Sequence, residues 1–146
     1  MNIKYCCAEF NMMNDIAGAR VLFESSAAVV QLPCLGVVSG FTISEPEMNY
    51  WFKGKNKLCD YLADIVIAAR NAHLKGKPWS RVIWDVTAVG WILNDGDRFM
   101  DSVVRNCGIP GYDMKYEMKA DSKLIRYVNF IKRDALLEDL IIKLTN

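Results

Sequence analysis

The chain has a single histidine, His73, and its five cysteines include no Cys-x-x-Cys spacing. One histidine late in a helical pattern gives little support to Ser-His-Asp or Cys-His catalysis. The cysteine count is odd and two cysteines, Cys6 and Cys7, are adjacent, which argues against a disulfide framework and against a zinc site. Free thiols indicate a reducing compartment, so we expect a cytoplasmic protein.

Charge clusters and long apolar runs are also lacking. The formal net charge is +1 and no run of lysines and arginines occurs, so we expect no nucleic acid partner. No window of about 18 apolar residues exists, so we expect no membrane span. The first residues do not combine a basic segment with an apolar one, and a signal peptide is therefore not expected.

The residues that are present describe one globular domain over residues 1–146. Apolar residues make up 52% and charged residues 24% of the chain. Residues 1–8 alternate as a short strand, and Asp15 is placed to cap a helix that ends at Ser25 and Ser26. Residues 28–32 form a continuous apolar run, typical of a strand covered on both faces, and Pro33 ends it.

Helix signals dominate the next part of the chain. Ser44-Glu45-Pro46-Glu47 is a capping box that predicts a short helix to about residue 52. Apolar spacing over residues 58–69 predicts a long amphipathic helix, stopped by Gly76 and Pro78. Residues 94–97 are a turn by composition.

The last third is richer in predicted strands. Residues 102–107 and 126–131 are strand candidates, residues 108–111 are expected to be a loop, and Asp134 is expected to cap a terminal helix. Because strands alternate with helices over the first two thirds, the predicted fold class is α/β with a mixed sheet.

One stretch joins a strand-like and a helix-like segment. Residues 81–84 favour a strand, residues 86–93 have helical spacing, and Asp85 stands between them. A helix N-cap is the simplest interpretation, because a carboxylate accepts hydrogen bonds from the first helical turn. The other interpretation is a ligand site, because the indole of Trp84 and the carboxylate of Asp85 together suit a flat ring with a polar substituent.

Two motifs in this order resemble a known family. Ala8-Glu9-Phe10-Asn11, followed by Asp15 and a helix reaching Val21-Leu22-Phe23-Glu24-Ser25, is similar to the second half of nucleoside hydrolases. Trp84-Asp85-Val86-Thr87-Ala88-Val89 resembles a later motif of the inosine/uridine-preferring members. The resemblance covers nearly the whole chain. It implies a Rossmann-like mixed sheet with flanking helices and calcium-dependent hydrolysis of the N-glycosidic bond of ribonucleosides to ribose and base.

The resemblance also implies roles for individual residues. Asp85 would be a calcium ligand that also holds a ribose hydroxyl, and Glu9 and Asn11 would bind other ribose hydroxyls. Trp84 would stack on the base, which favours a purine nucleoside as the partner. Asn2 lies near the place of another ribose-binding asparagine.

The chain departs from that family in one respect. Such enzymes begin with an aspartate-rich segment that supplies most calcium ligands and the aspartate that activates water. This sequence starts almost on the Glu9-Phe10-Asn11 motif. We therefore expect a single partial domain without the N-terminal half, no catalytic residue in this chain, calcium not bound by it alone, and no activity alone.

The sequence leaves two other functions open. One alternative is a non-catalytic interaction module derived from half of that fold, which uses an exposed sheet edge to pair with another chain. Another is an unrelated α/β domain, in which Glu9 is a surface carboxylate, Asn11 a cap and Trp84 a core aromatic. The expected protein partners are a complementing N-terminal half or further copies of the chain.

Overall fold

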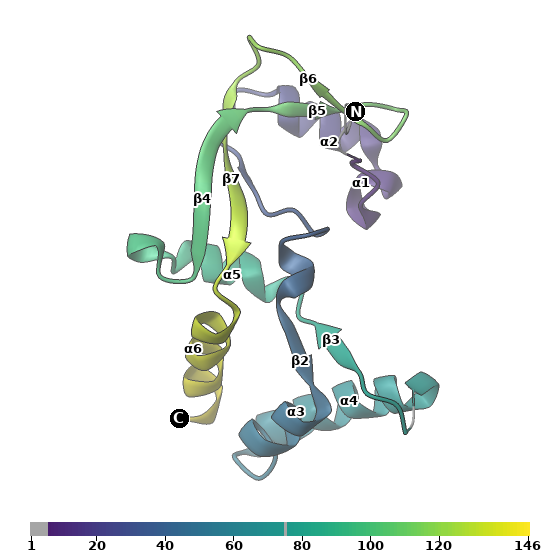
Figure 1. The fold of residues 1–146 in the computed structure, drawn as a ribbon, viewed down its shortest axis with the longest axis vertical. Helices are drawn as coiled ribbons and strands as arrows, with labels where there is room; N and C mark the ends of the chain where they lie inside the picture. Colours follow the sequence, from purple (N-terminus) through teal and green to yellow (C-terminus); the bar gives the residue numbers. More distant parts are fainter. Residues whose placement is uncertain (1–5, 75) are drawn as a thin grey trace.

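The computed structural model describes residues 6–74 and 76–146 as a mixed α/β structure (Figure 1). Residues 1–5 lie outside the described residues. They include most of the predicted first strand and Asn2, with its expected ribose role. Six α-helices occur in the described part: α1 (Phe10–Asn14), α2 (Ile16–Glu24), α3 (Glu45–Trp51), α4 (Lys57–Leu74), α5 (Val86–Ile92) and α6 (Arg133–Thr145). No helix among the described residues has the length and apolar character needed to cross a membrane.

A small mixed sheet forms the middle of the structure. Its strand order is β1-β7-β4, with β1 (Val30–Gln31) parallel and β4 (Met100–Asn106) antiparallel to β7 (Leu124–Ile131). Two antiparallel pairs accompany it. One joins β2 (Thr42–Ser44) to β3 (Ser80–Val82), and the other joins β5 (Gly108–Pro110) to β6 (Tyr116–Met118).

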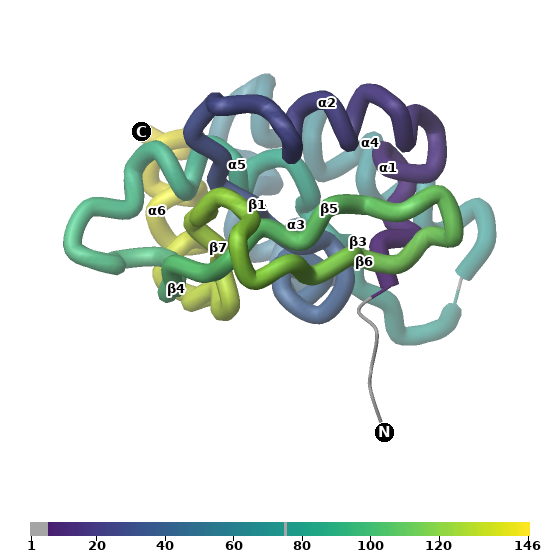
Figure 2. Tube along the Cα trace, turned by 90° about the horizontal axis from the view of Figure 1, so that it is seen from above, coloured from purple at the N-terminus to yellow at the C-terminus, as the bar shows by residue number. Residues whose placement is uncertain are grey.

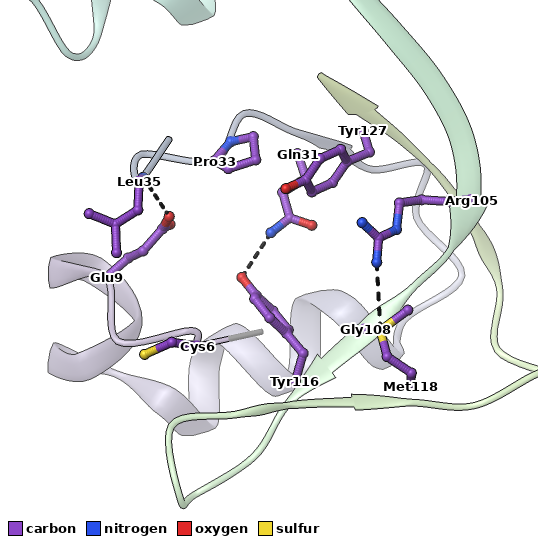
Figure 3. A pocket seen from close by; sticks show the side chains of 10 residues that line it. All are labelled: Cys6, Glu9, Gln31, Pro33, Leu35, Arg105, Gly108, Tyr116, Met118 and Tyr127. Atoms are coloured by element: carbon purple, nitrogen blue, oxygen red, sulfur yellow. Dashed lines mark hydrogen bonds between the residues drawn. The ribbon is translucent and has the colours of Figure 1, made fainter. Parts of the chain in front are cut away.

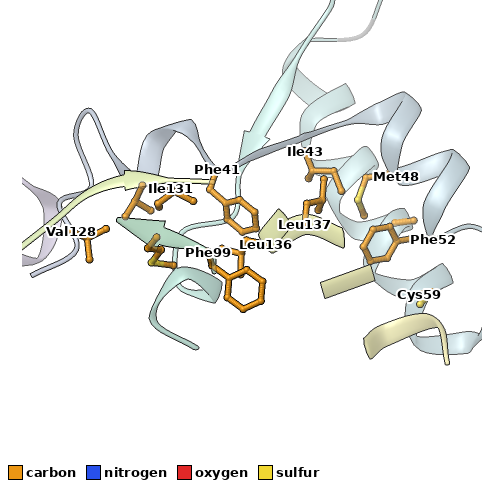
Figure 4. Close-up of a cluster of buried hydrophobic side chains, with 13 residues drawn as sticks. Phe41, Ile43, Met48, Phe52, Cys59, Phe99, Val128, Ile131, Leu136 and Leu137 are labelled. Carbon is orange, nitrogen blue, oxygen red and sulfur yellow. The ribbon is translucent and has the colours of Figure 1, made fainter. Parts of the chain in front are cut away.

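The larger hydrophobic core lies where α6 meets the strands and helices around it (Figure 4). Phe41, Phe99, Met100 and Val128 are fully buried there, and Leu136 from α6 packs with them. A second, smaller core joins α2 to the strands through Phe23, Cys107, Ile109 and Ile125. Helix α2 packs against β5, above the β5–β6 pair in Figure 2.

Local signals set the helix starts. Asp15 caps α2 by accepting a hydrogen bond from the Gly18 N–H at 2.8 Å, as predicted. The capping box at α3 is also confirmed, because both Ser44 and Glu47 make its reciprocal bonds. Arg133, at the start of α6, pairs with Glu47 and donates two hydrogen bonds to the Thr42 carbonyl. These contacts link α6 to β2 and to the start of α3.

Some local predictions are wrong. The run at residues 28–32 forms only the two-residue strand β1, and Val30 is exposed rather than covered on both faces. Residues 108–110 form β5 instead of a loop. Asp134 lies within the first turn of α6, and the N-cap position belongs to Lys132. The errors at residues 28–32 and 108–110 have one cause. The length and position of β1 and β5 depend on pairing with β7 and β6, which local sequence does not show.

Candidate functional site

Glu9 occupies the N-cap position of α1, but its carboxylate points away from that helix. Its Oε1 atom accepts a hydrogen bond from the Leu35 N–H at 3.2 Å, and no capping bond to α1 forms. Leu35 follows β1 by a few residues, so this bond holds the carboxylate at the carboxyl end of that strand (Figure 3). Strand ends of this kind are common positions for ligand-binding groups in α/β structures.

A small cavity of about 100 Å³ opens beside Glu9. Gln31 donates a hydrogen bond to the Tyr116 hydroxyl at 2.8 Å within it, and Tyr116 contacts the Met12 sulfur at 3.3 Å (Figure 3). Burial, reinforced by the charge of Glu9, raises the pKa of Tyr116, so this phenol stays protonated and neutral at physiological pH. Arg105 lines the far side and stacks 4.6 Å from the ring centre of Tyr127.

Cys34 lies between the two sequence motifs. Burial raises the pKa of the Cys34 thiol, and the negative charges of Glu9 and Asp85 raise it further. The fold therefore brings the charges of Glu9 and Asp85 within electrostatic reach of one thiol.

Trp84 and Asp85 occupy the turn between β3 and α5. Asp85 holds the N-cap position of α5, as predicted, but its side chain does not make the expected capping hydrogen bond. The Thr87 hydroxyl donates to the Trp84 carbonyl at 2.7 Å and stabilises this turn instead. The Asp85 carboxylate is therefore not used for helix capping.

An apolar groove of about 340 Å³ begins at this turn. Trp84 and Asp85 line one part of it, and Ile43, Met48 and Leu140 line other parts. The Trp84 side chain is 43% exposed, so it is not a core aromatic and presents ring surface to the solvent. The volume of the groove lies within the range of roughly 300–1,000 Å³ that small-molecule sites occupy.

Asn11, the remaining predicted site residue, lies outside both the cavity and the groove. It lies in α1, is exposed, and lines neither the cavity beside Glu9 nor the groove at Trp84. Glu9 thus lines the small cavity and Trp84 and Asp85 line the groove, both carboxylates act on the Cys34 thiol, and Asn11 lies at the surface.

The residues around Asp85 do not fit a calcium site by themselves. Calcium requires roughly six to eight oxygen ligands, mostly from carboxylates, carbonyls and water. Among the described residues no group of three or more histidine, cysteine, aspartate or glutamate side chains could hold a metal ion. Asp85 offers one carboxylate, and further ligands would have to come from elsewhere.

Sequence reasoning missed Cys34, Gln31 and Tyr116 as parts of this region. A signal for Cys34 existed, because it follows Pro33 at the end of an apolar strand, where α/β structures place ligand groups. No local signal marked Tyr116, whose position depends on the pairing of β6 with β5.

Comparisons with models of protein families, with characterised proteins and with solved structures find no match to this chain.

Proposed function

We propose that the chain forms one wall of a ribonucleoside site related to that of nucleoside hydrolases. In this proposal Glu9 and Asp85 bind ribose hydroxyls, and Trp84 stacks on the base. The reaction class is hydrolysis of the N-glycosidic bond to give ribose and a free base. The Rossmann-like sheet of that family is part of the same proposal.

Two observations support the proposal: the Glu9 carboxylate is bound by the Leu35 N–H beside Cys34, and the charges of Glu9 and Asp85 both raise the pKa of the Cys34 thiol. The two carboxylates come from the two motifs on which the family resemblance rests. A pair of carboxylates can accept hydrogen bonds from the hydroxyls of one sugar. They also stabilise the positive charge that develops on the ribosyl group as the glycosidic bond breaks.

Trp84 supports a purine as the base. Its exposed indole stands at the mouth of an apolar groove, next to the carboxylate of Asp85. Stacking of a base on an aromatic ring contributes about 1–3 kcal/mol, and a purine offers the larger ring face. Asn11 lines neither the cavity nor the groove and is not part of the proposed site.

Catalysis needs more than the described residues provide. Asp85 would contribute one ligand to a calcium ion, and the water-activating base would come from a complementing segment. We therefore propose that this chain alone binds a nucleoside without cleaving it. The five free cysteines support a reducing, cytoplasmic setting for the complex.

A binding assay tests the proposal. Ligand-observed NMR with inosine and with uridine should show binding to the wild-type chain, weakened in Glu9→Gln and in Asp85→Asn. Glu138→Gln and Asp95→Asn are matched controls, because these exposed carboxylates lie in α6 and in the 94–97 turn. Equal binding by all five proteins would overturn the proposed site.

Ribose release separates the enzyme from the alternative. With added calcium, the chain alone should release no ribose from inosine. Release after addition of a complementing N-terminal half, lost in Asp85→Asn, would identify a split hydrolase. Nucleoside binding that never leads to release would favour the non-catalytic module.

A further inference from the structure

Strand β4 is an outer strand of the three-stranded sheet, and β7 is its pairing partner among the described residues (Figure 1). An outer strand presents a row of unpaired N–H and C=O groups that can pair with another chain. The backbone hydrogen bonds at the two ends of β4 show which of its residues have outward-facing N–H and C=O groups. The Phe99 carbonyl accepts from the Lys132 N–H at 2.8 Å, and the Cys107 N–H donates to the Lys123 carbonyl at 2.8 Å.

Odd-numbered residues therefore direct their backbone groups towards β7, and even-numbered residues direct theirs outward. Within the strand Met100 fits this alternation, because its N–H and its carbonyl both bond to the side-chain amide of Asn94 at 2.8 Å, and the N–H of Phe99, just before the strand, also donates to that amide. That amide takes the place of a neighbouring strand at the first position of the edge. Ser102 and Val104 are the next two outward-facing residues.

The other end of the edge is also covered. The Asn106 side chain donates to the carbonyls of Lys119 and Ala120, so the connection between β6 and β7 lies against this end of β4. The uncovered stretch runs between Met100 and Asn106, and Val103 is its centre. Val103 and Val104 are both about half exposed, so the stretch presents apolar side chains as well as backbone groups.

We infer that β4 pairs antiparallel with β4 of a second copy of this chain, across a two-fold axis at Val103. In this register Ser102 of each copy faces Val104 of the other, and both present outward backbone groups to the partner. Asp101 of each copy then faces Arg105 of the other. Opposite charges directly across an antiparallel pair stabilise it, whereas like charges destabilise it.

The charge pattern favours a second copy over an unrelated strand. Asp101 and Arg105 are equally spaced on either side of Val103 and carry opposite signs, so the segment is complementary to itself when reversed. Within one chain Asp101 also pairs with Lys132 at 2.9 Å and Arg105 stacks on Tyr127, so each would share its charge between its own chain and the second copy. Self-complementarity is the property that a two-fold interface requires. A register centred on Val104 would lose both charge pairs. The inference does not depend on nucleoside binding, so each can fail without the other.

Light scattering after size exclusion, from micromolar to millimolar protein, tests the pairing. The wild-type chain should approach twice its monomer mass as the concentration rises. Val104→Pro should remain monomeric with an unchanged circular dichroism spectrum, because proline there removes only an outward N–H. A wild-type chain that is monomeric throughout, or a folded Val104→Pro variant that still dimerises, would overturn the inference.

Disulfide trapping tests the register in a Cys6→Ser background, which removes the exposed native thiol. Val103→Cys should form a covalent dimer on mild oxidation, because residues facing each other at this kind of position lie about 4.5 Å apart between Cα atoms. Val104→Cys is the matched control and should not. Cross-linking through position 104 and not 103 would contradict the proposed axis.

Charge reversal gives an independent check. Asp101→Arg should weaken dimerisation at least several-fold, and adding Arg105→Asp to it should restore the wild-type level. A double variant as weak as the single one, while still folded, would show that the two residues do not face each other.

Discussion

Glu9 and Asp85, which lie far apart in the sequence, both raise the pKa of the Cys34 thiol. Leu35, the neighbour of Cys34, holds the Glu9 carboxylate through its N–H at 3.2 Å. Asp85 enters from the turn between β3 and α5. The charges of two carboxylates from separate motifs therefore act on one thiol just after β1, and the proposed ribose site rests on this proximity.

Replacing Trp84 with alanine should weaken inosine binding by roughly ten-fold, because the stacking surface for the base is lost. Uridine binding should fall by less, since a pyrimidine covers less of the ring. Trp51→Ala is the matched control, because Trp51 is 42% exposed and lies outside the groove at Trp84. Equal losses for the two nucleosides would remove the stacking role of Trp84.

Glu47→Gln should lower the free energy of unfolding by about 1–3 kcal/mol near neutral pH, because Glu47 links Ser44 to Arg133 through hydrogen bonds. Urea unfolding measures this change. Glu45→Gln, two residues earlier in the first turn of α3, is the control and should change the stability little.

The contribution of Glu47 should also depend on pH. Burial acts to raise the pKa of Glu47, but the hydrogen bonds from Ser44 and Arg133 outweigh it, so the pKa lies below the ordinary value of 4.5. A carboxyl with a lowered pKa in the folded state stabilises the fold above its unfolded pKa. The difference between wild type and Glu47→Gln should therefore shrink as pH falls below 4.5. A difference that is constant from pH 7 to pH 3 would contradict this origin.

Gly90→Ala should lower the free energy of unfolding by roughly 1–3 kcal/mol through overpacking. A Cβ atom at position 90 would lie 2.7 Å from a Leu136 methyl carbon and 3.0 Å from the Met100 methyl carbon. Gly40→Ala is the control, because its added Cβ meets nothing within 4 Å. Thermal unfolding of both variants checks the packing of α5 on α6, and equal melting temperatures would be inconsistent with it.

The starts of α2 and α3 were predictable because their causes lie within a few residues. The capping box at Ser44 and Glu47 and the Asp15 cap need no distant partner, and both form as predicted. The short strand β5 was not predictable in this way. Gly108 lies against Tyr116 and Met118 of β6, so its conformation depends on a partner that local sequence does not identify.

The candidate site was predictable in part for the same reason. The two motifs that resemble the nucleoside hydrolase family pointed to Glu9 and Asp85. Both carboxylates raise the pKa of the Cys34 thiol. Asp85 was predicted to cap α5, but the capping bond does not form. Cys34 itself was missed, because only the tertiary structure brings it within reach of the two carboxylates.

The pH dependence of Cys34 alkylation, followed by mass spectrometry of its peptide, tests the proximity of Glu9 and Asp85 to Cys34 most directly. Neutralising either carboxylate removes a charge that raises the pKa of the thiol. Glu9→Gln and Asp85→Asn should therefore each move the alkylation profile of Cys34 to lower pH, whereas Asp95→Asn should leave it unchanged. A profile that moves in only one of the two variants, or in neither, would contradict the convergence of the two motifs.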